Sequence, residues 1–233
     1  MRKTEELKRE AACYAVRFVR DGMRVGLGHG STTWYALEEL GRLLKEGALT
    51  GIVGVPCSEE VQEHAGGLGI PLGGLDEHPE LDLTIDGADE VSPDMGLIKG
   101  GGGALLREKI VAQASRREII VVDEGKLSPR LGTRHPVPVE VVPFGWRGQA
   151  AFVRSLGGRA ALRQGEAPFR TDQGNFILDC DFGPMDDPRG LAVRLERRAG
   201  VVEHGLFLDL ATDVVVAGEG GVRHFGRGEK VVL

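Results

Sequence analysis

One short segment of the chain places acids, a lysine and glycines close together. Residues 84–110 read TIDGADEVSPDMGLIKGGGGALLREKI. Asp86 and Asp89 follow an apolar run typical of a buried strand, and Lys99 precedes four consecutive glycines. Glu108 lies on the helix predicted to follow the glycines. Carboxylates can transfer protons, and a loop without side chains lets backbone N–H groups approach a ligand closely. The segment therefore predicts proton transfer on a small, hydroxylated anion.

Each feature of this segment also has a simpler explanation. Aspartate before glycine is common in turns, where its carboxylate accepts from backbone amides. Glu108 could form a solvated ion pair with a neighbouring lysine or arginine. The glycines are harder to explain in this way, because one turn needs only one or two of them and each is entropically costly.

Residues 25–34, VGLGHGSTTW, read as a strand, a glycine turn and the start of a helix. Backbone N–H groups and the helix dipole favour an anion there, and Ser31 and Thr32 add hydroxyl donors. The GxGxxG fingerprint of dinucleotide-binding proteins would need glycine at Thr33, so that class of site is not indicated. The alternatives are a phosphate-binding turn and a plain strand-to-helix connection.

Residues 121–132, VVDEGKLSPRLG, again follow a strand with polar residues. Lys126 is predicted either to bind a phosphate or to lie in an ordinary loop. The histidines show no HExxH or comparable spacing, so no metal site is predicted. Trp34 and Trp146 fall in helical patterns, which favours packing over stacking on a ligand.

The overall composition narrows the class of protein. The chain has 233 residues, of which 41% are hydrophobic and 27% charged, which suits one large or two small globular domains. A net charge of −6 disfavours a nucleic-acid partner. No apolar run approaches the ~18 residues of a membrane span, and the N-terminus lacks the apolar region of a signal peptide. Three widely spaced cysteines indicate free thiols. We expect a soluble, cytoplasmic protein without a membrane partner.

The first half of the chain alternates strands and helices. Apolar runs predict strands at 23–27, 51–56, 81–86 and 118–123. Between them, helices are predicted after Ser31 and Ser58, each as N-cap, and over 104–115. The last helix is expected to turn Leu106, Ile110, Val111 and Ala114 inward. Alternation of this kind predicts an α/β fold with a doubly wound, mostly parallel sheet.

The order of elements changes after residue 135. Strands are predicted at 136–142, 161–164, 175–182 and 201–208, and helices at 146–158 and 188–200. This β-α-β-β-α-β order is typical of a ferredoxin-like α+β domain. A last strand over 213–225 would return to the first sheet. We therefore predict a Rossmann-like domain formed by 1–130 and 208–233, and a smaller ferredoxin-like domain at 131–207.

The quoted motifs together resemble the A-type ribose-5-phosphate isomerases. The resemblance rests on GHGST, TIDGADE, IKGGGGALLREK, VVDEGKL and HPVPVEVVP in this order and spacing, and extends to GNFILD and VVEHGLF. It implies interconversion of ribose 5-phosphate and ribulose 5-phosphate through an enediolate, a step of the non-oxidative pentose phosphate pathway. It also implies that no metal or organic cofactor is needed, and that the chain forms a homodimer or homotetramer.

The resemblance also implies roles for individual residues. Glu108 matches the catalytic base, Asp86 and Asp89 an acidic pair that opens the sugar ring and handles hydroxyl protons, and Lys99 the lysine beside the glycine loop. The substrate-binding positions it implies are His29, Gly30, Ser31, Thr32, Gly87, Ala88, Gly100, Gly101, Gly102 and Lys126. One position departs from the family pattern, because His29 stands where threonine is usual.

Two other classes of protein remain open from the sequence. One is a sugar-phosphate sensor domain, which usually follows a DNA-binding helix-turn-helix, whereas only one helix is predicted before the first strand here. The other is an acyl- or CoA-transferase-like enzyme that uses a glutamate nucleophile. Ketose formation from ribose 5-phosphate would distinguish the isomerase from both.

Overall fold

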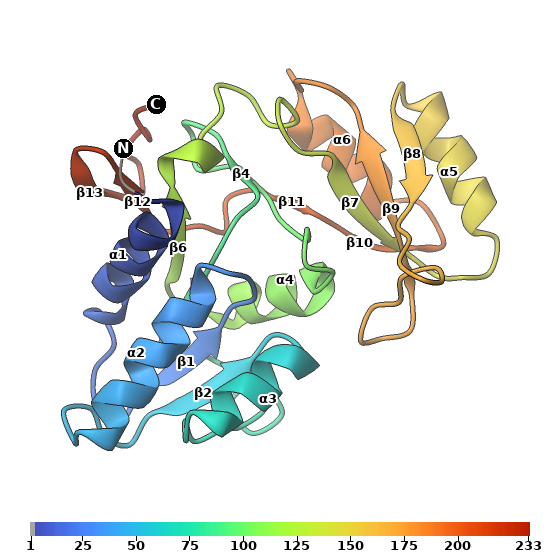
Figure 1. Cartoon of the computed structure of the whole chain (residues 1–233). Coiled ribbons are helices and arrows are strands. Elements are labelled where there is room, and N and C mark those ends of the chain that lie inside the picture. Colours follow the sequence, from blue (N-terminus) through green and yellow to red (C-terminus); the bar gives the residue numbers. More distant parts are fainter. Residues whose placement is uncertain (1–2) are drawn as a thin grey trace.

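The computed structural model describes residues 3–233 and contains a large six-stranded sheet, a small four-stranded sheet and a three-stranded sheet (Figure 1). The large sheet has six strands in the order β13-β12-β6-β3-β1-β2. Its strands are β1 (Arg24–Leu27), β2 (Val53–Pro56), β3 (Leu83–Asp86), β6 (Glu118–Asp123), β12 (Asp213–Gly218) and β13 (Gly221–Gly226). All neighbouring pairs are parallel except β12 and β13, which form an antiparallel hairpin. The predicted α/β class with a mostly parallel sheet is confirmed.

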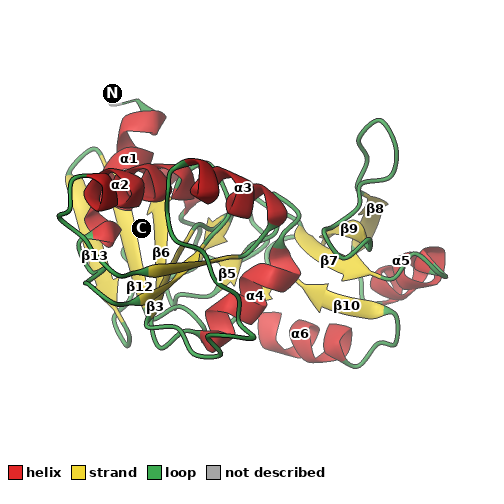
Figure 2. Ribbon diagram, turned by 90° about the horizontal axis from the view of Figure 1, so that it is seen from below, coloured by secondary structure: helices red, strands yellow, loops and turns green. Residues whose placement is uncertain are grey.

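Helices and short strands cover the two faces of the large sheet (Figure 2). Apolar side chains of α1 (Thr4–Val16), α2 (Thr33–Lys45) and α3 (Glu59–Gly67) pack in one core with β1, β3 and β6. On the other face, α4 (Leu105–Ala114) and a three-stranded sheet pack against β6 and β12. That sheet consists of β4 (Glu90–Val91), β5 (Leu97–Ile98) and β11 (Leu206–Phe207).

The small sheet is antiparallel and has the strand order β10-β7-β9-β8. Its elements are β7 (Val137–Val141), α5 (Trp146–Ser155), β8 (Arg159–Leu162), β9 (Phe176–Asp181), α6 (Pro188–Glu196) and β10 (Val201–His204). In chain order this is β-α-β-β-α-β, the arrangement predicted for a ferredoxin-like unit. The domain boundaries themselves stay a prediction.

The structure corrects the predicted single strand at 201–208. The segment divides at Gly205, with β10 in the small sheet and β11 in the three-stranded sheet. Gly205 donates to Pro138 O at 2.7 Å and accepts from Lys99 N at 2.9 Å. A Cβ at this position would lie 2.2 Å from Lys99 O, so only glycine permits the crossing. The predicted strand over 213–225 is likewise two strands, β12 and β13.

Two predictions about helices also need correction. The N-cap of α2 is Thr32 rather than Ser31, whereas Ser58 caps α3 by accepting from Val61 N, as predicted. On α4, Ile110 is 44% exposed rather than inward. The helix buries Glu108 and Lys109 instead, because both polar groups find partners inside the protein.

Candidate active site

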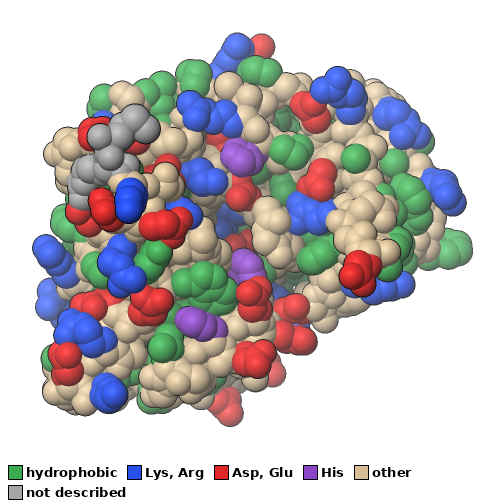
Figure 3. All heavy atoms as spheres, in the orientation of Figure 1, with side chains coloured by type: hydrophobic (Ala, Val, Ile, Leu, Met, Phe, Trp, Pro, Cys, Tyr) green, Lys and Arg blue, Asp and Glu red, His purple; other side chains and the backbone are tan. Residues whose placement is uncertain are grey.

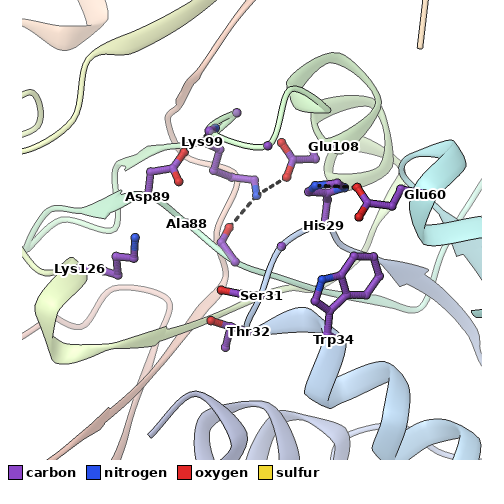
Figure 4. A pocket seen from close by; sticks show the side chains of 15 residues that line it. His29, Ser31, Thr32, Trp34, Glu60, Ala88, Asp89, Lys99, Glu108 and Lys126 are labelled. Carbon is purple, nitrogen blue, oxygen red and sulfur yellow. Dashed lines mark hydrogen bonds and ion pairs between the residues drawn. The ribbon is translucent and has the colours of Figure 1, made fainter. Parts of the chain in front are cut away.

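A pocket of about 330 Å³ lies beyond the carboxyl ends of β1 and β3, beside the first turn of α4 (Figure 4). The residues that line it are His29, Gly30, Ser31, Thr32, Trp34, Glu60, Gly87, Ala88, Asp89, Lys99, Gly100, Gly101, Gly102, Glu108 and Lys126. The structure thus brings together every predicted substrate-binding residue and three of the four predicted catalytic ones. The fourth, Asp86, lies directly behind the pocket wall.

Lys99 is at the centre of the charged groups. Its side chain is 2% exposed, and Nζ lies 3.0 Å from both Asp86 Oδ2 and Glu108 Oε1. It also donates to Gly87 O at 2.6 Å. Burial alone would lower the pKa of Lys99, but the carboxylates of Asp86 and Glu108 outweigh that effect and raise it. Lys99 is therefore a fixed positive charge at the pocket floor.

Glu108 presents a free carboxylate oxygen. Oε1 accepts from Lys99, whereas Oε2 has no hydrogen-bond partner among the described residues. The side chain is 4% exposed, and this burial raises the pKa of Glu108 to about 8 although Lys99 opposes the shift. A carboxyl group with this pKa can take up and release a proton near neutral pH.

Asp86 and Asp89 have different surroundings. Asp86 is 1% exposed, and its Oδ1 accepts from His29 N at 3.1 Å and from Gly87 N at 2.7 Å. It therefore joins the turn after β1 to the turn after β3. Asp89 lines the pocket and accepts from Gly101 N at 2.8 Å. Of the two acids, only Asp89 is placed to contact a ligand directly.

The contacts around the glycine loop explain its composition. Another group occupies the space where each side chain would be. A Cβ would lie 2.9 Å from Leu105 at Gly100, 2.7 Å from Asp89 at Gly101, 2.5 Å from the His29 ring at Gly102 and 2.4 Å from Phe169 at Gly103. Gly100 and Gly103 also have φ values of 104° and 91°, which disfavour other residues. The four glycines therefore allow close packing around the backbone of the loop.

Hydroxyl and ammonium groups gather in the part of the pocket near the start of α2. Ser31 and Thr32 precede the helix, and Lys126 comes from the 3-10 turn η1 (Glu124–Lys126) after β6. Figure 4 shows these three side chains on the opposite side of the pocket from Glu108. Two hydroxyls, a helix N-terminus and an ammonium group suit a phosphate.

Sequence reasoning missed two residues of the pocket. Trp34 was predicted only to pack; it does pack, at 4.5 Å between ring centroids from His64, but it also lines the pocket. Glu60 lies 3.7 Å from His29 Nε2, and His29 Nδ1 lies 3.0 Å from Ser58 Oγ. Trp34 could have been predicted to line the pocket, because it follows Gly30 by one helical turn. Nothing in the sequence linked Glu60 to the turn after β1.

Within residues 3–233, no group of three or more His, Cys, Asp or Glu side chains is arranged to hold a metal ion. Cys13, Cys57 and Cys180 are free. No helix in this part of the chain combines the length and apolarity needed to cross a membrane. Figure 3 shows Lys, Arg, Asp and Glu side chains interspersed over one face. The cofactor-free reaction stays a prediction.

Comparison with known proteins identifies the family. Residues 53–221 match the family model of ribose 5-phosphate isomerase A, also called phosphoriboisomerase A. The chain is 58% identical to ribose-5-phosphate isomerase A of Chloroflexus aurantiacus, over 95% of this chain and 93% of that protein. It is 48% identical to the probable ribose-5-phosphate isomerase 2 of Arabidopsis thaliana, over 94% and 86% of the two chains.

Solved structures agree with these relatives along nearly the whole chain. A D-ribose-5-phosphate isomerase in complex with phospho-erythronic acid superposes with a TM-score of 0.95 at 41% identity, covering 97% of this chain and 100% of that one. Ribose 5-phosphate isomerase A from Methanocaldococcus jannaschii gives 0.92 at 40% identity, with 96% and 100% covered. The chain therefore belongs to the ribose 5-phosphate isomerase A family.

Proposed function

We propose that Glu108 is the base in the reaction of this chain, the interconversion of ribose 5-phosphate and ribulose 5-phosphate. The observation that supports this role most is the unpartnered Glu108 Oε2 on a buried side chain that lines the pocket, with Lys99 Nζ 3.0 Å from the other oxygen. A proton acceptor and a fixed positive charge are thus adjacent, as abstraction of a proton next to a carbonyl requires.

The proposed reaction moves one proton between two carbons. In the open-chain aldose, Glu108 Oε2 removes the proton from C2, and the electron pair forms the C1–C2 double bond while O1 becomes an oxyanion. The resulting enediolate is stabilised by the Lys99 ammonium and backbone N–H groups of the glycine loop. The proton then returns from Glu108 to C1, while a proton moves from O2 to O1 and leaves the C2 carbonyl of the ketose.

The other pocket residues fit supporting roles. Asp89 lies beside the glycine loop, where its carboxylate can exchange protons with a sugar hydroxyl and assist opening of the furanose ring. Asp86 is the positioning group of the acidic pair, because it is buried against two turns. We place the phosphate at Ser31, Thr32 and Lys126.

The phospho-erythronic acid bound by a relative suggests a ligand for this chain as well. Its carboxylate is planar and anionic and carries two oxygens, as the enediolate does. We expect it to bind here with its phosphate near Lys126 and its carboxylate near Lys99.

The direct test is incubation of the protein with ribose 5-phosphate in deuterated water, followed by NMR. Isomerisation predicts ribulose 5-phosphate carrying deuterium at C1, and loss of the C2 hydrogen from recovered substrate. Binding without turnover would favour a sensor, and a requirement for an acyl-CoA would favour a transferase. The homodimeric or homotetrameric assembly and the cytoplasmic location stay predictions, and light scattering would test the first.

A further inference from the structure

The small sheet contains a hairpin, formed by β8, β9 and the loop between them, that contacts the elements around the pocket. Figure 2 shows the loop between β8 and β9 projecting beyond the small sheet, on the same side as α3. In this loop Asp172 accepts from Glu59 N at 2.9 Å, and it lies 3.1 Å from Arg107 Nη1. Arg107 adjoins Glu108 on α4. The hairpin is therefore fixed to the first turns of both α3 and α4.

Arg163, at the base of this hairpin, holds the glycine loop. Its Nη1 donates to Gly100 O at 2.8 Å and to Gly101 O at 3.1 Å. Its Nε and Nη2 donate to the two carboxylate oxygens of Asp179 on β9. One side of the planar guanidinium thus binds Asp179 of the small sheet, and the other side binds the carbonyls of Gly100 and Gly101. The side chain is 15% exposed and does not line the pocket.

These bonds determine how two peptide groups of the loop are oriented. In a planar trans peptide the C=O and the N–H point in opposite directions. The peptide between Gly100 and Gly101 is held at both ends, by Arg163 at the carbonyl and by Asp89 at the N–H. The next peptide is held only at its carbonyl, because Gly102 N–H has no acceptor within the described part of the protein. That N–H points away from Arg163, and Gly102 lines the pocket.

We infer that Arg163 is a positioning residue of the isomerase reaction, which keeps the Gly102 N–H directed into the pocket as a donor to the enediolate oxyanion. The inference rests on the proposed function of the pocket. A peptide between two glycines has little intrinsic preference for one orientation, since neither residue has a Cβ. Without the guanidinium this donor would lose its fixed direction, although Lys99 and Glu108 would stay in place.

The test compares Arg163→Met with a matched control, Arg159→Met. Arg159 is the first residue of β8, whereas Arg163 directly follows that strand; Arg159 pairs with Asp181 of β9, as Arg163 pairs with Asp179, but it is 86% exposed and has no bond to the glycine loop. We expect kcat of Arg163→Met to fall at least about tenfold, with KM within about threefold, because a preorganised donor acts mainly in the transition state. Arg159→Met should match the parent.

Ligand affinity separates positioning from general loosening of the pocket. Phospho-erythronic acid should lose affinity for Arg163→Met in parallel with kcat, whereas inorganic phosphate, which reaches only the Lys126 side, should bind unchanged. Equal losses for both ligands would overturn the inference, as would an Arg163→Met variant with parental kcat. If that variant does not fold, Arg163→Lys replaces it, because one ammonium cannot satisfy Asp179 and both carbonyls.

The parent protein offers a measurement that needs no substitution. On addition of phospho-erythronic acid, the amide proton of Gly102 should shift downfield in the NMR spectrum as it forms a new hydrogen bond. The amide of Gly101, already bonded to Asp89, should move much less. An unmoved Gly102 resonance in a saturated complex would contradict the inference. Failure of the parent to isomerise would instead count against the proposed function.

Discussion

At the scale of single residues, burial gives Glu108 its chemistry. The same side chain on an exposed helix would have an ordinary carboxylate pKa and would form a weak surface ion pair. Here it is buried beside Lys99, and one of its oxygens has no hydrogen-bond partner among the described residues. The sequence identified the residue, but the free oxygen and the shifted pKa depend on neighbours that only the fold supplies.

Glu108→Gln should abolish proton transfer while preserving the shape of the pocket. We expect turnover to fall by roughly 10²–10⁴-fold or more, since the amide cannot accept the proton. KM should change much less, because the carboxylate acts on the reacting carbon in the transition state. Steady-state kinetics and exchange of the C2 hydrogen with deuterated water measure both effects. A folded variant with parental turnover would transfer the role of base to Asp89.

The activity of the parent should depend on the ionisation of Glu108. Because the pKa of Glu108 is raised to about 8, the base is mostly protonated at pH 6 and mostly ionised at pH 9. We therefore expect kcat/KM to rise with pH, with a midpoint near about pH 8 and a plateau above about pH 9. A profile of kcat/KM from pH 5 to 10 tests this expectation. An acid limb centred near 4.5 would mean that Glu108 is not the group that must lose its proton.

Lys99→Arg should be damaging although the charge is kept. The ammonium occupies a site that is 2% exposed and has three oxygen partners within 3.0 Å. A guanidinium is planar and broader, so it would displace Glu108 or the loop beside it. We expect kcat to fall at least about tenfold and the melting temperature to drop. Kinetics close to those of the parent would show that Lys99 contributes its positive charge and that the exact position of the ammonium group does not matter.

At the scale of elements, regular strands and helices were predictable, whereas the connecting elements were not. The runs that became β3 and β6 are continuous and apolar, as buried parallel strands are. β4 and β5 have two residues each, too few for any periodic pattern. The exposure of Ile110 on α4 was also unpredictable, because that helix turns charged residues toward partners that are distant in the sequence.

Glu90, on β4, illustrates a structural role for an acid that directly follows the catalytic candidate Asp89 in the sequence. The side chain is fully buried, and its two oxygens accept from the backbone N–H groups of Gly132, Thr133, Arg134 and His135. These bonds fix the connection that leads from the large sheet into β7. Glu90 does not line the pocket.

Glu90→Gln should therefore reduce stability rather than catalysis. An amide has one oxygen and cannot accept from all four donors, and hydrogen bonds to charged groups contribute about 1.5–3 kcal/mol. We expect urea denaturation to show a loss of that order, with kcat nearly unchanged. The control is Glu80→Gln, which breaks an exposed pair with Arg116 and should cost less than ~1 kcal/mol. Equal losses in the two variants would show that the four bonds are not important.

At the scale of the whole molecule, the parallel sheet gathers distant segments at one edge. Turns after β1, β3 and β6 meet there because the carboxyl ends of parallel strands share that edge, and the glycine loop, which follows β5 of the three-stranded sheet, lies beside them. The meeting of the turns after β1, β3 and β6 follows from the alternation of strands and helices in the sequence, because that alternation predicts a parallel sheet. The contact between the small sheet and the glycine loop was not predictable. It depends on how two sheets pack, and the sequence has no local signal for that packing.

One carboxyl group in the large sheet is buried without a hydrogen-bond partner among the described residues. Glu118, at the start of the central strand β6, is 1% exposed, and neither of its oxygens has a hydrogen-bond partner among residues 3–233. Burial, reinforced by the carboxylate of Asp86, raises the pKa of Glu118 well above its ordinary value. The folded protein therefore keeps the proton of Glu118 to a higher pH than the unfolded chain, in which the group ionises above about pH 4.5.

This difference predicts how stability depends on pH. Above about pH 4.5 the unfolded state loses the proton of Glu118, whereas the native state keeps it until the pH approaches the raised pKa, so unfolding releases this proton and stability falls as pH rises over that interval. One such proton corresponds to about 1.4 kcal/mol per pH unit. Glu108, with its pKa raised to about 8, adds a slope of the same sign over the same range. Glu118→Gln removes only the first contribution.

We therefore expect Glu118→Gln to gain stability relative to the parent as pH rises. Urea denaturation at pH 5, 6, 7 and 8 measures the difference in unfolding free energy, which should increase steadily over the series. A buried amide without partners would shift every value equally and would not change the slope. Glu166→Gln, an exposed substitution with the same charge change, should give a flat difference. A flat difference for Glu118→Gln as well would mean that the buried carboxyl ionises in the folded protein, and the sheet would then have to hold an uncompensated charge at its centre.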